Sequence, residues 1–183
     1  RAATISSIFR RRDCPLCGHS FAKEIEETRH QISDFVMTEI DLLKRSNFAW
    51  CDLFGDDCAL LATGFKAWAG VFFLSGRWYA VGGAEKLPAR LLGAGERTVC
   101  LAQANDWLND QEVDDAAHKT RRWLQESPTP GQLRYLPAPL RADFSLTRYQ
   151  ASALLTFQFN KTAIQRLVTA ANDAVMAEFR EVA

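Results

Sequence analysis

Residues 60–81 read LLATGFKAWAGVFFLSGRWYAV, a stretch rich in aliphatic and aromatic side chains that contains the polar turn sequence Ser75-Gly76-Arg77. Large apolar residues on both sides of a glycine turn are typical of two antiparallel strands joined as a hairpin. Gly82-Gly83 would end the second strand, and Arg97 to Leu101 would add a third. The sequence therefore predicts a small antiparallel sheet over residues 61–102. Its aromatic side chains have two open uses, burial in a core, which is commoner, and stacking of bases.

Beyond the predicted sheet the apolar spacing becomes helical. Ala102 to Glu126 carries acidic residues in its first half and basic residues in its second, which suits the dipole of a helix that begins near Asp110. Ser127-Pro128-Thr129-Pro130 predicts a stop and a restart, with Thr129 as the cap of a short helix over residues 131–136. A helix from about Ser145 to a break at Asn160, and another over about 162–179, complete a predicted helical bundle.

Four cysteines form two pairs that could close around one metal ion. Cys14 and Cys17 enclose Pro-Leu and precede Gly18, and after 33 intervening residues Cys51 and Cys58 follow with six residues between them. Two thiolate pairs are the usual ligand set of a structural zinc site. The predicted Zn²⁺ ligands are Cys14, Cys17, Cys51 and Cys58, with His19 and His30 as reserve ligands.

Two other interpretations of these cysteines stay open. Cys51 and Cys58 could be small buried residues, as free cysteines often are, and as Cys100 is expected to be. The C-x-x-C pair could be a redox motif, although no strand is expected before it, as a thioredoxin-like unit would require. A closed four-thiolate site has no open position for a substrate, so the zinc would stabilise the fold.

The fold class that follows is α+β, in three parts. We expect a zinc-stabilised module with an inserted helix over residues 1–60, the small antiparallel sheet over 61–102, and a basic helical bundle over 103–183. Five cysteines and no expected signal peptide favour the reducing cytoplasm. No apolar run approaches about 18 residues, so we expect no membrane span.

Charge is balanced overall but unevenly distributed. The chain has 22 basic and 22 acidic residues, yet between Lys119 and Arg166 eight basic residues face only two acidic ones. Arginine outnumbers lysine there, which suits bidentate contacts with phosphate or guanine, and Arg10 to Arg12 add a second basic run. The alternative is a solvated surface. The predicted nucleic-acid-binding residues are Arg10, Arg11, Arg12, Lys119, Arg121, Arg122, Arg134, Arg148 and Lys161.

The order of modules resembles a known family. The C-P-L-C-G-H motif at residues 14–19, the second cysteine pair, the small sheet, and the stretches Thr129–Leu136 and Thr147–Leu155 together look like the large-subunit-like protein of type IV CRISPR effector complexes. The resemblance implies a non-catalytic subunit in antiviral or antiplasmid defence. It would sit at one end of a guide-RNA filament and contact the duplex motif that flanks the target DNA. The implied partners are guide RNA, target DNA, other backbone subunits and a helicase recruited later.

Two further functions compete with a nucleic-acid-binding subunit. One is a metal-dependent nuclease, although its candidate carboxylates fall in one helical run and lack the strand-borne pattern of such sites. These carboxylates are Asp106, Asp110, Glu112, Asp114 and Asp115. The other is a zinc-stabilised adaptor that binds a protein partner through exposed aromatic residues, with no nucleic acid.

Overall fold

The structure is a computed structural model that describes residues 42–182, with side-chain exposure described up to residue 177. The predicted ligands Cys14 and Cys17, the reserve ligands His19 and His30, and Arg10 to Arg12 lie outside the described residues. The described residues form one compact unit. Within it, no helix combines the length and the hydrophobicity needed to cross a bilayer.

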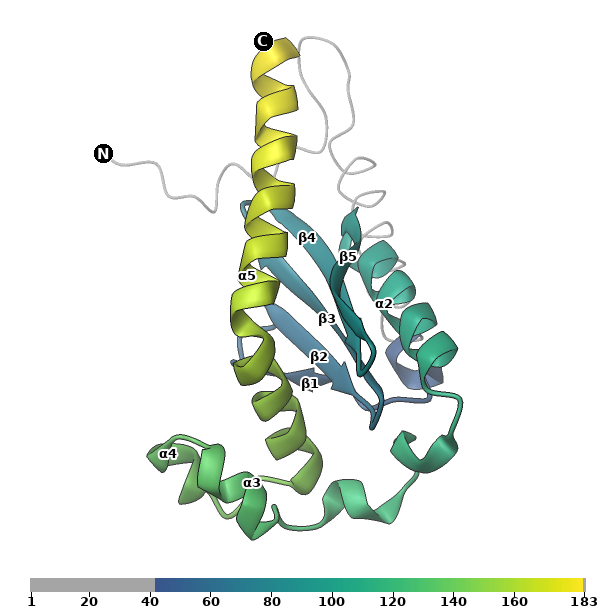
Figure 1. Ribbon diagram of the computed structural model, residues 1–183, viewed down its shortest axis with the longest axis vertical. Helices are drawn as coiled ribbons and strands as arrows, with labels where there is room; N and C mark the ends of the chain where they lie inside the picture. Colours follow the sequence, from purple (N-terminus) through teal and green to yellow (C-terminus); the bar gives the residue numbers. More distant parts are fainter. Residues whose placement is uncertain (1–41, 183) are drawn as a thin grey trace, which may run out of the picture. The chain divides into compact units, whose positions relative to one another are not determined.

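A five-stranded antiparallel sheet forms the centre of this unit (Figure 1). Each strand pairs with the next along the chain, so the order in the sheet is β1-β2-β3-β4-β5. The strands are β1 (Cys51–Asp52), β2 (Ala59–Thr63), β3 (Ala67–Leu74), β4 (Arg77–Ala84) and β5 (Leu87–Gly95). The prediction of an α+β fold with a small antiparallel sheet is confirmed.

The turn between β3 and β4 is the one expected from the sequence. Ser75 and Gly76 both have positive φ, 52° and 79°, and Leu74 pairs directly with Arg77. Positive φ at both central residues gives a two-residue hairpin turn whose twist matches that of the strands. Glycine adopts such an angle without a steric penalty, which explains the interruption of the apolar run at this point.

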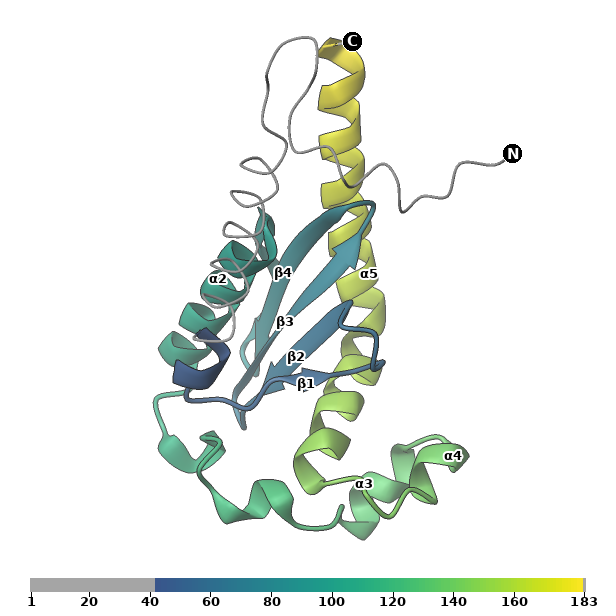
Figure 2. The ribbon, with the colours of Figure 1, turned by 180° about the vertical axis from the view of Figure 1, so that it is seen from behind.

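Two long helices cover the two faces of the sheet (Figure 1; Figure 2). α2 (Arg97–Gln111) packs on one face through Leu101, Ala104 and Leu108, whereas α5 (Arg148–Val182) packs on the other through Ile164 and Val168. Because both faces of the sheet are covered, the inner strands β2, β3 and β4 are apolar almost throughout instead of alternating with polar residues. The result is three layers, helix, sheet and helix.

α2 approaches the sheet closely where a side chain is missing. A Cβ atom added at Gly82 would lie 2.6 Å from the ring of Trp107, which is closer than real Cβ contacts allow. Gly82 in β4 therefore makes room for Trp107 of α2. The glycine that was expected to end a strand instead lies within one, where it permits a close helix contact.

Three expectations for the secondary structure after β5 were wrong. Residues 97–101, expected to be a third strand, form the first turn of α2, and α2 ends at Gln111, so no helix begins near Asp110. Short 3-10 segments, η2 (Asp115–Ala117) and η3 (Arg122–Gln125), follow it. Asn160 does not break α5, because its side-chain Nδ2 donates to the carbonyl of Thr156 inside a continuous helix.

The predicted bundle over residues 103–183 forms only in part. α3 (Pro130–Tyr135) and α4 (Ala138–Arg141) pack on the beginning of α5 around a small cluster of leucines. α2 instead belongs to the opposite face of the sheet. The helices therefore divide between two covering layers and one small lobe.

Candidate nucleic-acid interface

The position of α5 is fixed at its first turn by Tyr149. The buried Tyr149 hydroxyl accepts the N–H of Thr63 at 3.1 Å and donates to the carbonyl of Ala49 at 2.5 Å. Burial raises the pKa of this phenol, so it stays protonated and keeps both contacts. One residue thus ties α5 both to β2 and to the segment that leads into β1.

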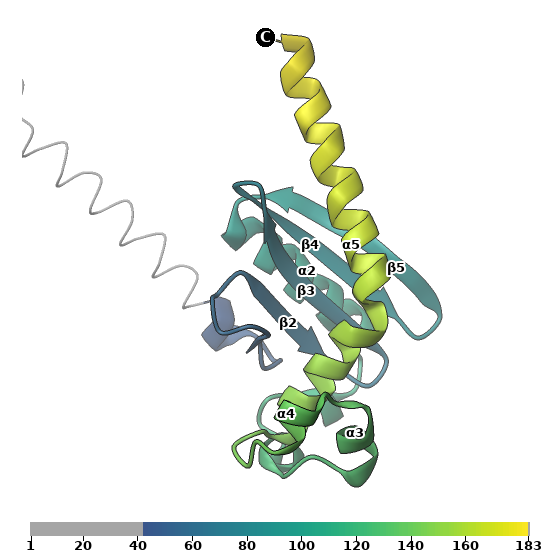
Figure 3. The same ribbon diagram turned by 90° about the vertical axis from the view of Figure 1, so that its left-hand side faces the viewer.

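The lobe of α3 and α4 is attached to α5 by a second set of polar contacts. Thr129 and Gln132 form a capping box, in which the N–H of Gln132 donates to Thr129 Oγ1 at 3.2 Å and the N–H of Thr129 donates to Gln132 Oε1 at 2.9 Å. The Gln132 Nε2 also donates to the carbonyl of Arg148 at 3.1 Å and to Ser152 Oγ at 2.8 Å. Figure 3 shows the lobe beside the first turns of α5. The prediction that Thr129 caps a short helix is confirmed.

Two aromatic rings meet on the outside of this junction. Tyr135, the last residue of α3, and Phe159 of α5 have ring centroids 6.0 Å apart and planes at 72°, an edge-to-face arrangement. Tyr135 is 57% exposed and Phe159 is 66% exposed. The pair therefore holds two ordered rings at the surface without burying either.

Two arginines accompany the aromatic pair. Arg134 precedes Tyr135, and Arg166 follows Phe159 by seven residues, close to two helical turns, so Phe159 and Arg166 share one side of α5. Both arginines are exposed, and neither makes an ion pair or hydrogen bond with a described residue. We call Arg134, Tyr135, Phe159 and Arg166 the α3/α5 surface.

The surroundings of the α3/α5 surface are basic. Residues 127–172 contain five arginines or lysines and one acidic residue, Asp143. The positive potential near unpaired arginines attracts polyanions over distances of about 10 Å at 0.1 M salt.

The fold and this surface can be compared with known proteins. The family model described as "Mitochondrial helicase Irc3, C-terminal domain" matches residues 25–173, well over half of the chain. The chain belongs to this family. Searches of curated proteins and of solved structures each returned no match.

The Irc3 C-terminal domain family covers the entire α3/α5 surface, from Arg134 to Arg166, as well as Cys51 and Cys58. The matched range begins after Cys14 and Cys17. The family does not bear on the resemblance to a type IV CRISPR effector subunit, which stays a prediction.

Three other predicted nucleic-acid-binding residues make contacts within the protein. Lys119 Nζ donates to the main-chain carbonyls of Leu43 and Lys44, and Arg121 pairs with Asp115. Arg148 pairs with Glu126 at 2.8 Å. A cation that already has a carbonyl or carboxylate partner in the protein must give up that contact to bind phosphate.

Arg122 and Lys161, also predicted to bind nucleic acid, are exposed and have no ion pair or hydrogen bond among the described residues. Lys161 lies two residues from Phe159, about 200° around α5, so it points to a different side of the helix. Arg134, which precedes Tyr135 in α3, is therefore the predicted residue that we assign to the α3/α5 surface.

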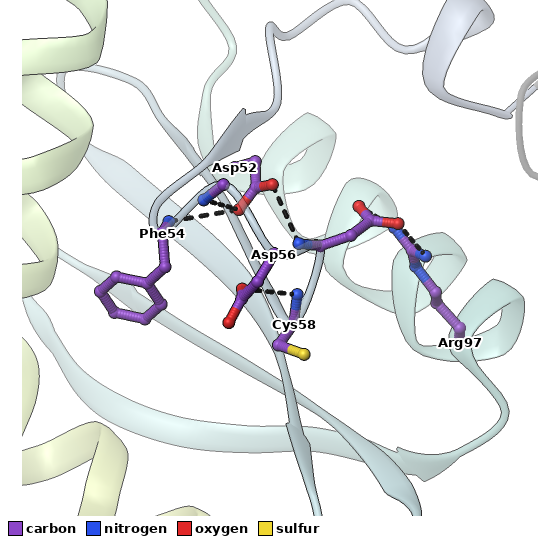
Figure 4. A network of polar contacts seen from close by, with 7 residues as sticks. Asp52, Phe54, Asp56, Cys58 and Arg97 are labelled. Carbon is purple, nitrogen blue, oxygen red and sulfur yellow. Dashed lines mark hydrogen bonds and ion pairs between the residues drawn. The ribbon is translucent and has the colours of Figure 1, made fainter.

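Cys51 is the first residue of β1, and Cys58 lies in the loop between β1 and β2 (Figure 4). Its turns are held by Asp52, whose carboxylate accepts the N–H groups of Phe54, Gly55 and Asp57 at 3.0–3.2 Å. Desolvation acts to raise the pKa of Asp52, but these hydrogen bonds and the charge of Arg97 outweigh it, so the pKa is lower than usual. Arg97 of α2 also forms a bidentate pair with Asp57, at 2.7 Å to each oxygen.

Cys51 and Cys58 have different surroundings. Cys51 pairs with Leu61 and packs against the core beneath α5, where burial raises the pKa of its thiol to about 12. Cys58 precedes Ala59, and its carbonyl extends the sheet by accepting the N–H of Phe73. Because Ala59 and Leu61 face α5, strand alternation directs Cys58 to the opposite face.

Of the four predicted zinc ligands, the described residues thus include only Cys51 and Cys58. Among residues 42–177, no three His, Cys, Asp or Glu side chains lie together in a way that could hold a metal ion. The four-cysteine zinc site, with its reserve histidines, stays a prediction, as do the buried and redox alternatives. A thiolate at Cys51 would require a neighbour that offsets its burial.

The candidate nuclease carboxylates do not share a site in the described structure. Glu112 is 4% exposed and its Oε1 accepts the N–H groups of Lys66 and Ala67, the latter at 2.6 Å. Asp114 caps η2 by accepting the N–H of Ala116, and Asp115 pairs with Arg121. Asp106 and Asp110 are exposed on α2.

Sequence reasoning missed both aromatic members of the α3/α5 surface. In the helix expected after Ser145, the apolar spacing places Tyr149, Ala153, Leu154 and Phe157 on one side, and Phe159 falls on the other side. A large aromatic residue on the polar side of an amphipathic helix was the available signal.

Proposed function

We propose that this chain is a nucleic-acid-binding module that accompanies a helicase motor and holds a strand on the α3/α5 surface. Two observations support the proposal. One is membership of a family described as the C-terminal domain of a helicase. The other, which carries the proposal, is that Arg134 and Arg166 are exposed and make no ion pair or hydrogen bond with a described residue, in a basic region beside two exposed aromatic rings.

The physical argument concerns the cost of forming phosphate contacts. An exposed arginine without a protein partner loses only water when it binds a phosphate, and it displaces counterions condensed on the nucleic acid. Lys119, Arg121 and Arg148 would first have to break existing contacts. Affinity should therefore depend on Arg134 and Arg166 more than on those three residues.

In this proposal the chain supplies affinity and orientation, and the motor supplies movement. A module that binds one strand near the motor raises the local concentration of that strand, which increases the overall affinity without new motor contacts. The strand would be held mainly through its backbone, so binding would have little sequence preference.

The test is the salt dependence of binding to a fluorescently labelled single-stranded oligonucleotide, measured by anisotropy with the full chain. We expect affinity to fall steeply with salt, and the double variant Arg134→Gln/Arg166→Gln to bind more weakly. Its log–log slope should be shallower by roughly 0.7 for each lost phosphate contact. The control for the loss of a positive charge is Arg77→Gln, because Arg77 lies at the hairpin turn between β3 and β4 and is not part of the α3/α5 surface.

Two results would contradict the proposal. Binding that is absent at about 50 mM salt would favour the adaptor interpretation, because phosphate-based binding is strongest at low salt. Equal affinity and equal slope in wild type and the double variant would show that the phosphate contacts lie outside the α3/α5 surface.

A further inference from the structure

We propose that Tyr135 and Phe159 form a stacking platform for unpaired bases, so that the α3/α5 surface selects single-stranded over double-stranded nucleic acid. This inference rests on the proposed function and goes beyond it, because phosphate contacts alone do not distinguish the two forms well. The bases of a duplex are stacked on one another, and their faces are not accessible to a protein ring.

The exposure of the two rings separates this pair from the other aromatic pairs at the surface. Phe54 contacts Phe157, Phe65 contacts Trp123, and Phe73 contacts Trp78, with centroid distances of 5.2–5.4 Å. In each of those pairs one ring is exposed, by 43–65%, and the other is partly buried. Only between Tyr135 and Phe159, among these pairs in the described residues, are both rings more than half exposed.

The geometry of the pair leaves a ring face available. At 72° between planes, one ring presents its edge to the other, so the faces of the edge-on ring are not covered by its partner. A base could lie on such a face. Stacking of a base on an aromatic side chain is sequence-tolerant, since every base has a flat π-system.

The platform is preorganised. The Gln132 side chain binds Arg148 and Ser152 and so fixes α3, while Ile164 and Val168 fix α5 on the sheet. The two rings extend from elements that are already held in place, so binding a base would require little additional ordering of the protein.

Charge complementarity identifies the occupant as a nucleic acid strand. Arg134 is next to Tyr135 in sequence, and Arg166 lies on the same side of α5 as Phe159. An unpaired strand offers bases for the rings and phosphates for the arginines together. An apolar peptide would bury the rings but leave two arginines without partners, at a cost in desolvation.

The experiment compares affinities for a single-stranded oligonucleotide and for a duplex of the same sequence. The test variant is Tyr135→Leu/Phe159→Leu, which keeps apolar side chains and helix-forming residues but removes both rings. We expect its single-strand affinity to fall by about tenfold or more, with duplex affinity changed less than about twofold. With 2-aminopurine in the strand, wild type should quench the fluorescence by stacking, and the double variant should not.

Two further variants make the result specific. Phe73→Leu removes an exposed ring near the end of β3, two residues before Ser75 of the hairpin turn, and should leave both affinities unchanged. Tyr135→Phe retains the ring and should keep the preference for single strands. Thermal unfolding of the double variant within a few degrees of wild type would exclude a folding defect as the cause.

The outcomes separate this inference from the proposed function. If the double variant loses single-strand and duplex affinity equally, or neither, the stacking platform is wrong while salt-dependent binding through the arginines stands. If wild type binds no nucleic acid at low salt, the proposed function and the platform both fail. Loss confined to the single strand, together with loss of quenching, supports the platform.

Discussion

The sheet with its two helices and the α3/α5 surface contain the same types of side chain in opposite situations. Within the sheet region, the guanidinium of Arg90 lies 4.1 Å from the Trp107 ring centroid and that of Arg97 lies 4.8 Å from the Trp78 ring. On the α3/α5 surface, the arginines and aromatic rings have no such partners within residues 42–182, apart from the contact between the two rings. Arginine and aromatic content alone therefore do not identify a binding surface; the absence of internal partners does.

This contrast predicts that stability and binding can be changed separately. Residues of the sheet region should affect unfolding and leave the salt dependence of binding unchanged. Residues of the α3/α5 surface should do the reverse, because exposed side chains without partners typically change stability by no more than about 0.5 kcal/mol.

The largest effect is expected on the side of α5 that packs on the sheet. Ile164 is buried in the core beneath α5, so Ile164→Ala should lower the free energy of unfolding by about 2–5 kcal/mol through lost packing and a cavity. Urea denaturation followed by circular dichroism would measure it. The adjacent Gln165→Ala, at an exposed position, is the control and should be nearly neutral. Equal effects of the two substitutions would contradict the placement of α5.

Glu112 should give the next largest effect. Glu112→Ala leaves the buried N–H of Ala67 without an acceptor, at a cost of about 1–3 kcal/mol, whereas the N–H of Lys66, an exposed residue, can bind water instead. Glu112→Gln keeps one oxygen and should destabilise less. Asp110→Ala, at an exposed carboxylate near the end of α2, should not destabilise the protein. If Glu112→Ala is as stable as wild type, the Glu112 carboxylate is not needed for the fold, which would contradict this structural role.

A substitution at Lys119 should have a smaller effect, and it tests whether a cation with partners inside the protein also binds phosphate. Lys119→Met removes the hydrogen bonds from Nζ to the carbonyls of Leu43 and Lys44 and should lower the free energy of unfolding by about 1 kcal/mol. The salt slope of oligonucleotide binding should stay that of wild type. A shallower slope would show that Lys119 contacts phosphate after all, as its sequence context suggested.

The sequence predicted those elements whose signals are local. The hairpin turn at Ser75-Gly76 and the cap at Thr129 depend on residues within a few positions, and both are present. β5 was missed because this edge strand contains Pro88, two glycines and exposed residues, which weaken the apolar pattern. α2 was misplaced because Thr98-Val99-Cys100-Leu101 has the β-branched composition of a strand, and packing on the sheet overrides that preference.

The candidate site was predicted only in part, for a related reason. Local sequence identified a basic region, but it could not distinguish Arg134 from Lys119 or Arg148. Their difference depends on partners distant in sequence, such as Leu43 for Lys119 and Glu126 for Arg148. The pairing of Tyr135 with Phe159 likewise spans two helices and becomes apparent only when α3 is placed against α5.

The smallest expected effect concerns the acid sensitivity of the loop between β1 and β2. The lowered pKa of Asp52 means that its ionised form is favoured in the folded state, through the N–H groups of Phe54, Gly55 and Asp57. This contribution to stability is fully present above the unfolded pKa of about 3.9 and is lost as pH falls through the folded pKa. Asp52→Asn, which cannot ionise, should therefore lose less stability than wild type between neutral pH and acid. Urea midpoints measured across this range would show it, and parallel acid profiles for the two proteins would mean that the carboxylate does not hold the loop. If the Asp52 carboxylate does hold the loop, Asp52 belongs with Glu112 and Lys119 among the charged residues whose contacts lie within the protein. The arginines of the α3/α5 surface should not contribute to this acid sensitivity.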